Sequence, residues 1–126
     1  MLVQKLQSCA EFIAGDGTQL RELLHPDKQP IELRYSLAHA IVPVGQTSIP
    51  HSLKTSEVYY IFSGMGEMHI DNETQVLEPG DAVYIPQMPS SLFATLEQNP
   101  WCLSVLSIRR GVKKMKQFTK RNDSIF

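Results

Sequence analysis

The sequence predicts an all-β protein in which about eight short strands form an antiparallel sandwich or barrel. Three observations support this prediction. Apolar and polar residues alternate in short runs, as in Ile31 to Tyr35, which is typical of a half-buried strand. Turn residues, mainly glycine, proline and asparagine, bound the runs. No long helical pattern could cover a parallel sheet, so we expect the 126 residues to form one β domain.

We expect one short helix near the N-terminus. Thr18 is a suitable N-cap residue, and the leucines that follow it would then share one apolar face: Leu20, Leu23 and Leu24. The helix would stop at His25, because the residue before a proline avoids the helical region. We therefore assign residues 1–30 to an N-terminal extension that contains this helix.

Strands and turns are predicted from residue 31 to residue 108. The strand-like runs are residues 31–35, 37–42, 47–53, 57–62, 66–70, 74–77, 82–85, 91–96 and 101–108. The turns between them include Ser63-Gly64, Asp71-Asn72, Pro79-Gly80 and Asn99-Pro100. We assign residues 31–108 to the barrel and residues 109–126 to a basic C-terminal tail.

The charges divide unevenly between body and tail. Residues 1–108 carry five Lys or Arg against twelve Asp or Glu, whereas residues 109–126 carry seven against one. The tail either remains solvated or docks on the acidic body, on a partner subunit or on a polyanion. An acidic body repels nucleic acid, so we do not expect nucleic-acid binding.

Composition excludes several other classes of protein. Hydrophobic residues make up 42% of the chain and charged residues 20%, which is ordinary for a globular domain. The sequence contains no apolar stretch of about 18 residues, so we expect no membrane-spanning helix. The first 14 residues lack the apolar run of a signal peptide, so we expect a cytoplasmic protein. Cys9 and Cys102 form no Cys-x-x-Cys pair, which argues against a zinc knuckle or a redox dithiol.

The segment around His51 carries the chemistry of greatest interest. It resembles the first cupin motif, G-x5-H-x-H-x3-E-x6-G, at four positions: Gly45, His51, Glu57 and Gly64. Leu53 stands where the motif has its second histidine. The resemblance implies a double-stranded β-helix, a small jelly-roll barrel, which in this family is commonly a dimer. We therefore expect a homodimer.

A second block resembles the second cupin motif, G-x5-P-x-G-x2-H-x3-N, but only at its start. Gly80 and Pro86 match. The positions of the later glycine, histidine and asparagine hold Met88, Ser91 and Thr95. The family's metal is usually held by three histidines and a glutamate inside the barrel, so the resemblance leaves two of four ligands, His51 and Glu57.

These losses leave two interpretations of the metal site open. Leucine cannot ligate a metal and a neutral serine is a poor ligand, whereas a divalent ion usually takes three protein ligands plus water, or four. The site is then metal-free, with His51 hydrogen-bonded to Glu57. Alternatively, further groups such as His39 complete it, and Zn, Mn, Fe or Ni are the candidate ions.

The same substitutions make the expected pocket more apolar. The candidate pocket residues are His39, Leu53, Tyr59, Ile61, Met88, Ser91 and Phe93. Such a pocket would bind a sugar or a partly apolar acid, oriented by a few polar groups. The alternative is that these side chains simply fill a small barrel.

Three functional hypotheses follow from these patterns. The first is a small-molecule-binding cupin barrel with a degenerate metal site. The second is a metal-dependent cupin enzyme, such as an oxygenase or a sugar isomerase resembling mannose-6-phosphate isomerase, in which Glu57 or His51 would orient the substrate or move a proton. The third is a regulatory partner domain that acts through its basic tail. The sequence does not designate a catalytic residue.

Overall fold

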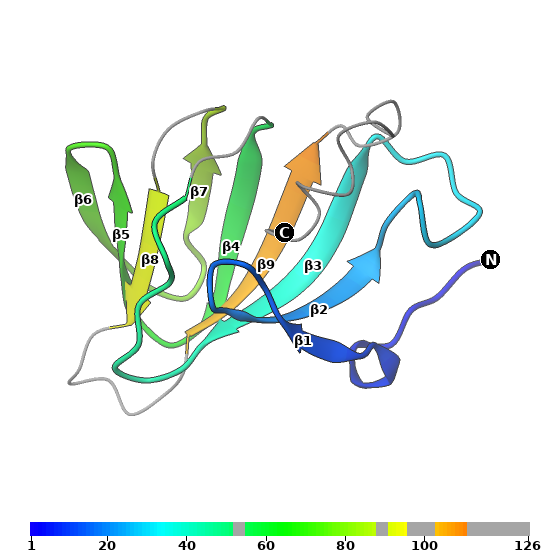
Figure 1. The fold of residues 1–126 in the computed structure, drawn as a ribbon, viewed down its shortest axis with the longest axis horizontal. Helices are drawn as coiled ribbons and strands as arrows, with labels where there is room; N and C mark the ends of the chain where they lie inside the picture. The colour runs from blue at the N-terminus through cyan, green and yellow to red at the C-terminus, as the bar shows by residue number, and fades with distance from the viewer. Residues whose placement is uncertain (52–54, 88–90, 96–102, 111–126) are drawn as a thin grey trace.

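The computed structural model describes residues 1–51, 55–87, 91–95 and 103–110, which form two antiparallel sheets (Figure 1). The larger sheet has six strands in the order β1-β2-β3-β9-β4-β7, and the smaller has three in the order β6-β5-β8. The strands are β1 (Glu11–Ile13), β2 (Gln19–Leu24), β3 (Tyr35–Val42), β4 (Glu57–Ser63), β5 (Gly66–Ile70), β6 (Glu73–Leu77), β7 (Ala82–Ile85), β8 (Ser91–Thr95) and β9 (Leu103–Arg110). The prediction of an all-β fold is confirmed.

The larger sheet has one inner and one outer face, as the alternation of side chains along a strand requires. Along β3, every second side chain is buried, beginning with Ser36 and continuing through Ala38, Ala40 and Val42. Along β4 the buried side chains are Glu57, Tyr59 and Ile61. Strand β9 pairs with β3 on one side and with β4 on the other, so these positions form one continuous inner face.

The hydrophobic core lies on this inner face and receives side chains from both sheets. Its buried apolar residues are Ala14, Leu20, Ala38, Ala40, Val42, Tyr59, Ile61, Met68, Leu77 and Ile85. Leu20 and Ile61 have no exposed surface at all. Truncating such a side chain to alanine typically costs about 2–5 kcal/mol, because it leaves a cavity as well as losing buried area.

Two tight turns shape the smaller sheet and its connection to β7. Asp71 joins β5 to β6 at φ 51°, in the left-handed region that aspartate tolerates better than most residues. Gly80, at φ 95°, lies in the turn before β7. Its N–H donates to the Ile61 carbonyl at 2.9 Å, which joins this turn to β4 and places β6 opposite β7.

The expected N-terminal helix is wrong, because residues 19–24 form strand β2. Leu20 faces Phe12 on one neighbouring strand and Ala40 on the other, so β2 has backbone partners on both sides. Helix propensity is a weak preference that such pairing and burial override. In the described part of the chain the helical residues are those of one 3-10 turn, η1 (Leu6–Ser8), and no helix there has the length and apolar character to cross a membrane.

The other strands lie close to their predicted positions. Strands β5 and β7 have the predicted bounds. Residues 31–34 form no strand. In the predicted strand 47–53, the described residues form only isolated bridges, at Thr47 and His51. Residues 52–54 lie outside the described part of the chain. Strands β1 and β2 join the larger sheet, so its first strand begins at Glu11, inside the region that we assigned to an extension.

Candidate functional site

A row of buried polar side chains crosses the inner face of the larger sheet. Arg109 of β9 is in register with Ser36 of β3 on one side and with Glu57 of β4 on the other. These three residues are only 6%, 6% and 1% exposed. Charged groups are rarely buried without a compensating partner. A guanidinium and a carboxylate on neighbouring positions of the same face provide this compensation.

Tyr59 adds a phenol to this row. Its hydroxyl donates a hydrogen bond to the Glu57 carboxylate. Burial raises the pKa of Tyr59 well above its ordinary value of 10.0, and the negative charges of Glu57 and Asp16 raise it further, whereas Arg109 opposes them. Tyr59 is therefore a neutral hydrogen-bond donor at physiological pH.

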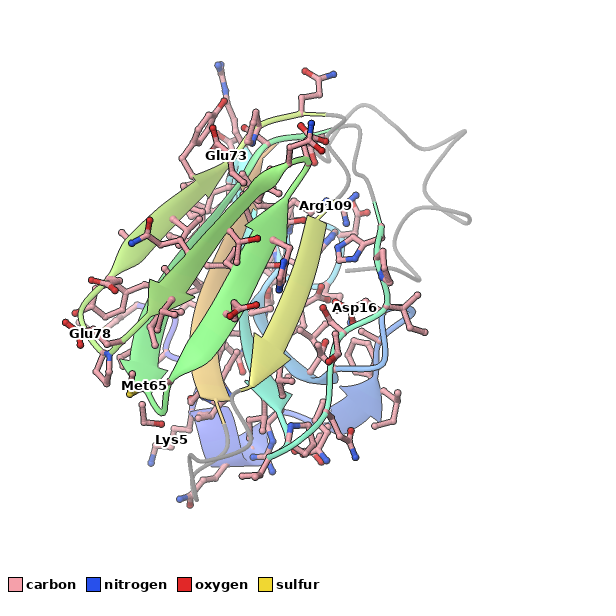
Figure 2. All side chains as sticks on the ribbon, turned by 90° about the vertical axis from the view of Figure 1, so that its left-hand side faces the viewer. Lys5, Asp16, Met65, Glu73, Glu78 and Arg109 are labelled. Atoms are coloured by element: carbon pink, nitrogen blue, oxygen red, sulfur yellow. The ribbon has the colours of Figure 1, made fainter. Side chains whose placement is uncertain are left out.

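Asp16 reaches this region from the turn between β1 and β2 (Figure 2). It is 2% exposed, and its Oδ1 accepts hydrogen bonds from the backbone N–H and the hydroxyl of Thr18, at 3.1 and 2.7 Å. Its backbone carbonyl accepts from the Ile49 N–H at 2.7 Å. The turn is thus joined to the segment that leads to His51, and it brings a second carboxylate into the field of Tyr59.

Arg109 also contacts the segment before β4. Its Nε donates to the Thr55 hydroxyl at 3.2 Å. The planar guanidinium has five N–H donors and remains charged at any accessible pH. Arg109 therefore gives the inner face a permanent positive charge. From the sequence we had assigned this residue to the basic tail.

His51 is held in a defined tautomer. Its Nδ1 lies 3.0 Å from the Ile49 carbonyl oxygen, which can only accept, so Nδ1 carries the proton in the neutral ring. The Nε2 atom, which then bears the lone pair, is buried. This hydrogen-bonding pattern resembles the one that orients metal-binding imidazoles.

The described donor set does not fit the family's metal. His51 and Glu57 supply one imidazole and one carboxylate, and the Glu57 carboxylate accepts from Tyr59. No group of three His, Cys, Asp or Glu side chains lies close enough to hold a metal ion within residues 1–51, 55–87, 91–95 and 103–110. A catalytic divalent ion usually takes three protein ligands. We therefore derive no chemistry through a metal.

The predicted pocket residues divide into three groups. Tyr59 and Ile61 are buried on the inner face. His39 alternates with the buried side chains of β3, and its Nε2 contacts the Ser104 hydroxyl at 2.6 Å, with the Phe62 ring 6.5 Å away. His39 thus lies on the outer face, apart from Glu57. The sequence did not exclude it from the site because the facing of this strand could not be assigned from the sequence alone.

The third group is described in part or not at all. Ser91 and Phe93 lie on β8, where the backbone register places them opposite Ile70 and Met68. Leu53 and Met88 lie outside the described residues. The sequence interpretation missed Asp16 and Arg109. No local alternation signals Arg109, because residues 103–109 read Leu-Ser-Val-Leu-Ser-Ile-Arg, in which apolar and polar residues do not alternate strictly.

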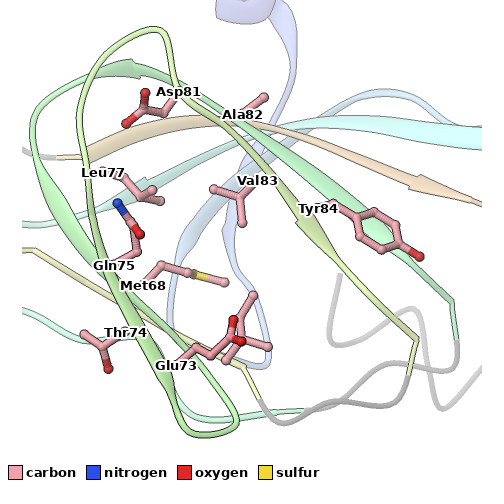
Figure 3. Close-up of a pocket in the computed structure, with 10 residues that line it drawn as sticks. Met68, Glu73, Thr74, Gln75, Leu77, Asp81, Ala82, Val83 and Tyr84 are labelled. Atoms are coloured by element: carbon pink, nitrogen blue, oxygen red, sulfur yellow. The ribbon is translucent and has the colours of Figure 1, made fainter.

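A cleft of about 670 Å³ opens between the inner side of the smaller sheet and strand β7 (Figure 3). The lining residues are Met68, Ile70, Glu73, Thr74, Gln75, Leu77, Asp81, Ala82, Val83 and Tyr84. Met68 and Leu77 belong to the core, and Val83 packs against it. Val83 is also the register partner of Tyr59, so the cleft and the buried polar row lie on adjacent strands.

Comparison with known proteins defines the class. Residues 38–89 match the cupin domain family. Together with the two-sheet barrel, this match makes the chain a small barrel protein of the cupin fold. An uncharacterized protein of Methanocaldococcus jannaschii is 47% identical over 76 residues, which are 60% of this chain and 60% of that protein. The matched region thus spans less than two thirds of that relative.

Solved structures confirm the fold. A predicted oxalate decarboxylase from Thermotoga maritima superposes with a TM-score of 0.75 at 17% identity, covering 88% of this chain and all of that chain (100%). The polyketide cyclase RemF from Streptomyces resistomycificus gives a TM-score of 0.73 at 18% identity and covers 99% of this chain and 98% of that one. The first is named as a predicted decarboxylase and the second as a cyclase, so the shared fold leaves the function of this chain open.

Proposed function

We propose that the protein binds a small, partly apolar molecule in the cleft between β5, β6 and β7, without using a metal. The observation that carries this proposal is the cleft itself. Its volume falls within the range of about 300–1,000 Å³ that is usual for small-molecule sites. Five of the ten lining residues are polar or charged, which suits a ligand that has both polar and apolar parts: Glu73, Thr74, Gln75, Asp81 and Tyr84.

The buried polar row lies behind the wall of the cleft, and its members Tyr59, Glu57 and Arg109 are not among the lining residues. Val83 on the wall of the cleft and Tyr59 on the adjacent strand are register partners. The Tyr59 phenol is neutral and donates to Glu57, while Arg109 supplies a fixed positive charge nearby. The row therefore keeps a defined charge pattern next to the cleft without a bound ion.

Two neighbouring residues on β6 allow a matched test. Gln75 lines the cleft, whereas Val76 is exposed and next in sequence, so it faces the other way. We expect a panel of small sugars, acids and amines to include compounds that shift the NMR signals of β5, β6 and β7. Gln75→Trp should weaken this binding at least tenfold and Val76→Trp should not. If no compound shifts these strands, or both variants bind alike, the cleft is not the site.

One observation favours the alternative of a metal-dependent enzyme such as an isomerase or an oxygenase. His51 has its Nδ1 proton fixed by the Ile49 carbonyl, which leaves Nε2 as the atom that would ligate. Elemental analysis after incubation with Zn, Mn, Fe or Ni tests this alternative. About one equivalent that is retained in His69→Ala and lost in His51→Ala would support it. The absence of bound metal in all samples would remove it.

We also propose that the protein forms a homodimer through the outer face of the larger sheet. Large apolar side chains are exposed there on three strands: Tyr35, Val58, Tyr60, Phe62 and Tyr84. The outward positions of β3, β4 and β7 carry no Asp, Glu, Lys or Arg. Four strands, β3, β9, β4 and β7, about 4.8 Å apart and up to eight residues long at about 3.3 Å per residue, span roughly 400 Å². Beyond them the ion pair of Arg21 and Glu11 lies on the same face.

A second copy is the occupant that best suits this face. A two-fold interface pairs a patch with itself, and an apolar, uncharged patch is self-complementary. Two such sheets can pack face to face as in a sandwich.

A further inference from the structure

The cleft between β5, β6 and β7 has negative charges at both of its ends. Glu73 begins β6, opposite Ile70 of β5. Asp81 comes at the other end of β6, after the turn that follows Leu77 (Figure 3). Glu73 and Asp81 are the charged residues of the lining, which includes no Lys or Arg.

Asp81 is held in place by its own turn. Its Oδ2 accepts a hydrogen bond from the Glu78 N–H at 2.9 Å, and its backbone N–H donates to the Glu78 carbonyl at 3.1 Å. These bonds fix the carboxylate at the end of the cleft. An ionised carboxylate has four lone-pair sites, so one backbone N–H leaves acceptor capacity for a ligand.

The space between the two carboxylates is aliphatic on one side, and the Gln75 amide also belongs to the lining between Glu73 and Leu77. Met68 and Leu77 are buried there, and Val83 forms the facing wall from β7. The four residue steps of β6 from Glu73 to Leu77 cover roughly 13 Å of strand. A molecule that matches this pattern has cationic groups at its ends and a methylene chain between them.

We propose that the cleft binds a linear aliphatic polyamine, with an ammonium group at each carboxylate and its methylene chain against Met68, Leu77 and Val83. The proposal rests on the function proposed above, since it names the ligand class of the same cleft. Its support is charge complementarity, because each end carries a carboxylate and the body of residues 1–108 is strongly acidic. A partly apolar acid, which the sequence suggested, would meet two like charges.

Calorimetric titration of the full chain tests this ligand class. The probes are spermidine, diaminooctane and octanediol, the last two being of equal length with and without charged ends. We expect both amines to bind, with affinity falling as salt is added, and the diol to bind at least tenfold more weakly. Glu73→Gln and Asp81→Asn should each weaken amine binding about threefold to fivefold.

Glu67→Gln is the matched control. Glu67 lies on β5 but outside the cleft lining, beside His69, so this variant removes the same charge without touching the site. Amine binding that falls equally in the Glu67 variant would reveal nonspecific attraction and overturn the proposal. If a sugar or an acid binds in a Gln75→Trp-sensitive way while amines do not, the ligand class is wrong and the cleft remains the site. If no probe or panel compound binds in that way, both proposals fail.

Discussion

At the scale of single residues, Tyr59 shows how burial fixes a protonation state. Its phenol is 5% exposed and donates to Glu57. Burial and the carboxylates of Glu57 and Asp16 raise its pKa above 10.0, so the unfolded chain ionises at a lower pH than the folded one. The unfolded state then binds fewer protons, and stability falls as pH rises above about 10.

We therefore expect the free energy of unfolding to decline more steeply above pH 10 in the native protein than in Tyr59→Phe. Urea unfolding between about pH 8 and pH 11 measures both slopes, because this interval brackets the ordinary tyrosine pKa of about 10. Below pH 10 the variant should be less stable by about 1–3 kcal/mol, because Glu57 loses a buried donor. Parallel curves for the two proteins would contradict the raised pKa.

His39 provides a second test at this scale. Burial lowers its pKa below 6.5, the positive charge of Arg21 lowers it further, and Glu11 partly opposes them. NMR titration should therefore place the pKa of His39 below 6.5. Arg21→Gln should raise this pKa and Glu11→Gln should lower it. Shifts in the opposite directions would show that these side chains do not lie near the imidazole.

At the scale of elements, strand β2 tests the corrected N-terminal region. A helix would bury Leu20, Leu23 and Leu24 on one face, whereas in β2 only Leu20 is fully buried. We expect Leu20→Ala to cost about 2–5 kcal/mol and Leu23→Ala markedly less. Chemical denaturation measures both values. Equal losses would support the helical interpretation instead.

At the scale of the whole molecule, a substitution on the outer face of the larger sheet tests the proposed homodimer. Phe62 is 53% exposed at this face and contacts Tyr60 edge-to-face with ring centroids 5.5 Å apart. Phe62→Lys would bring a positive charge from each copy into the proposed interface, so we expect the dimer to dissociate at least tenfold more readily. Sedimentation analysis measures this change, and Val76→Lys on the smaller sheet is the control. A native protein that is monomeric at all concentrations would overturn the dimer.

The sequence by itself determined the features that depend on neighbouring residues. The turns at Asp71 and Gly80 and the bounds of β5 and β7 follow from turn chemistry and from a period of two. The same rule correctly placed Glu57 and Tyr59 on one face of β4, and the motif around them identified the barrel.

Only the tertiary structure decided the features that depend on distant strands. Residues 19–24 became a strand because β1 and β3 pair with them on both sides. His39 faces outward and Arg109 inward because pairing with β9 fixes the face of each position, and no local pattern contains that register. Asp16 lies near Tyr59 although more than forty residues separate them in the sequence. Periodicity describes neighbouring residues only, so it cannot predict this proximity.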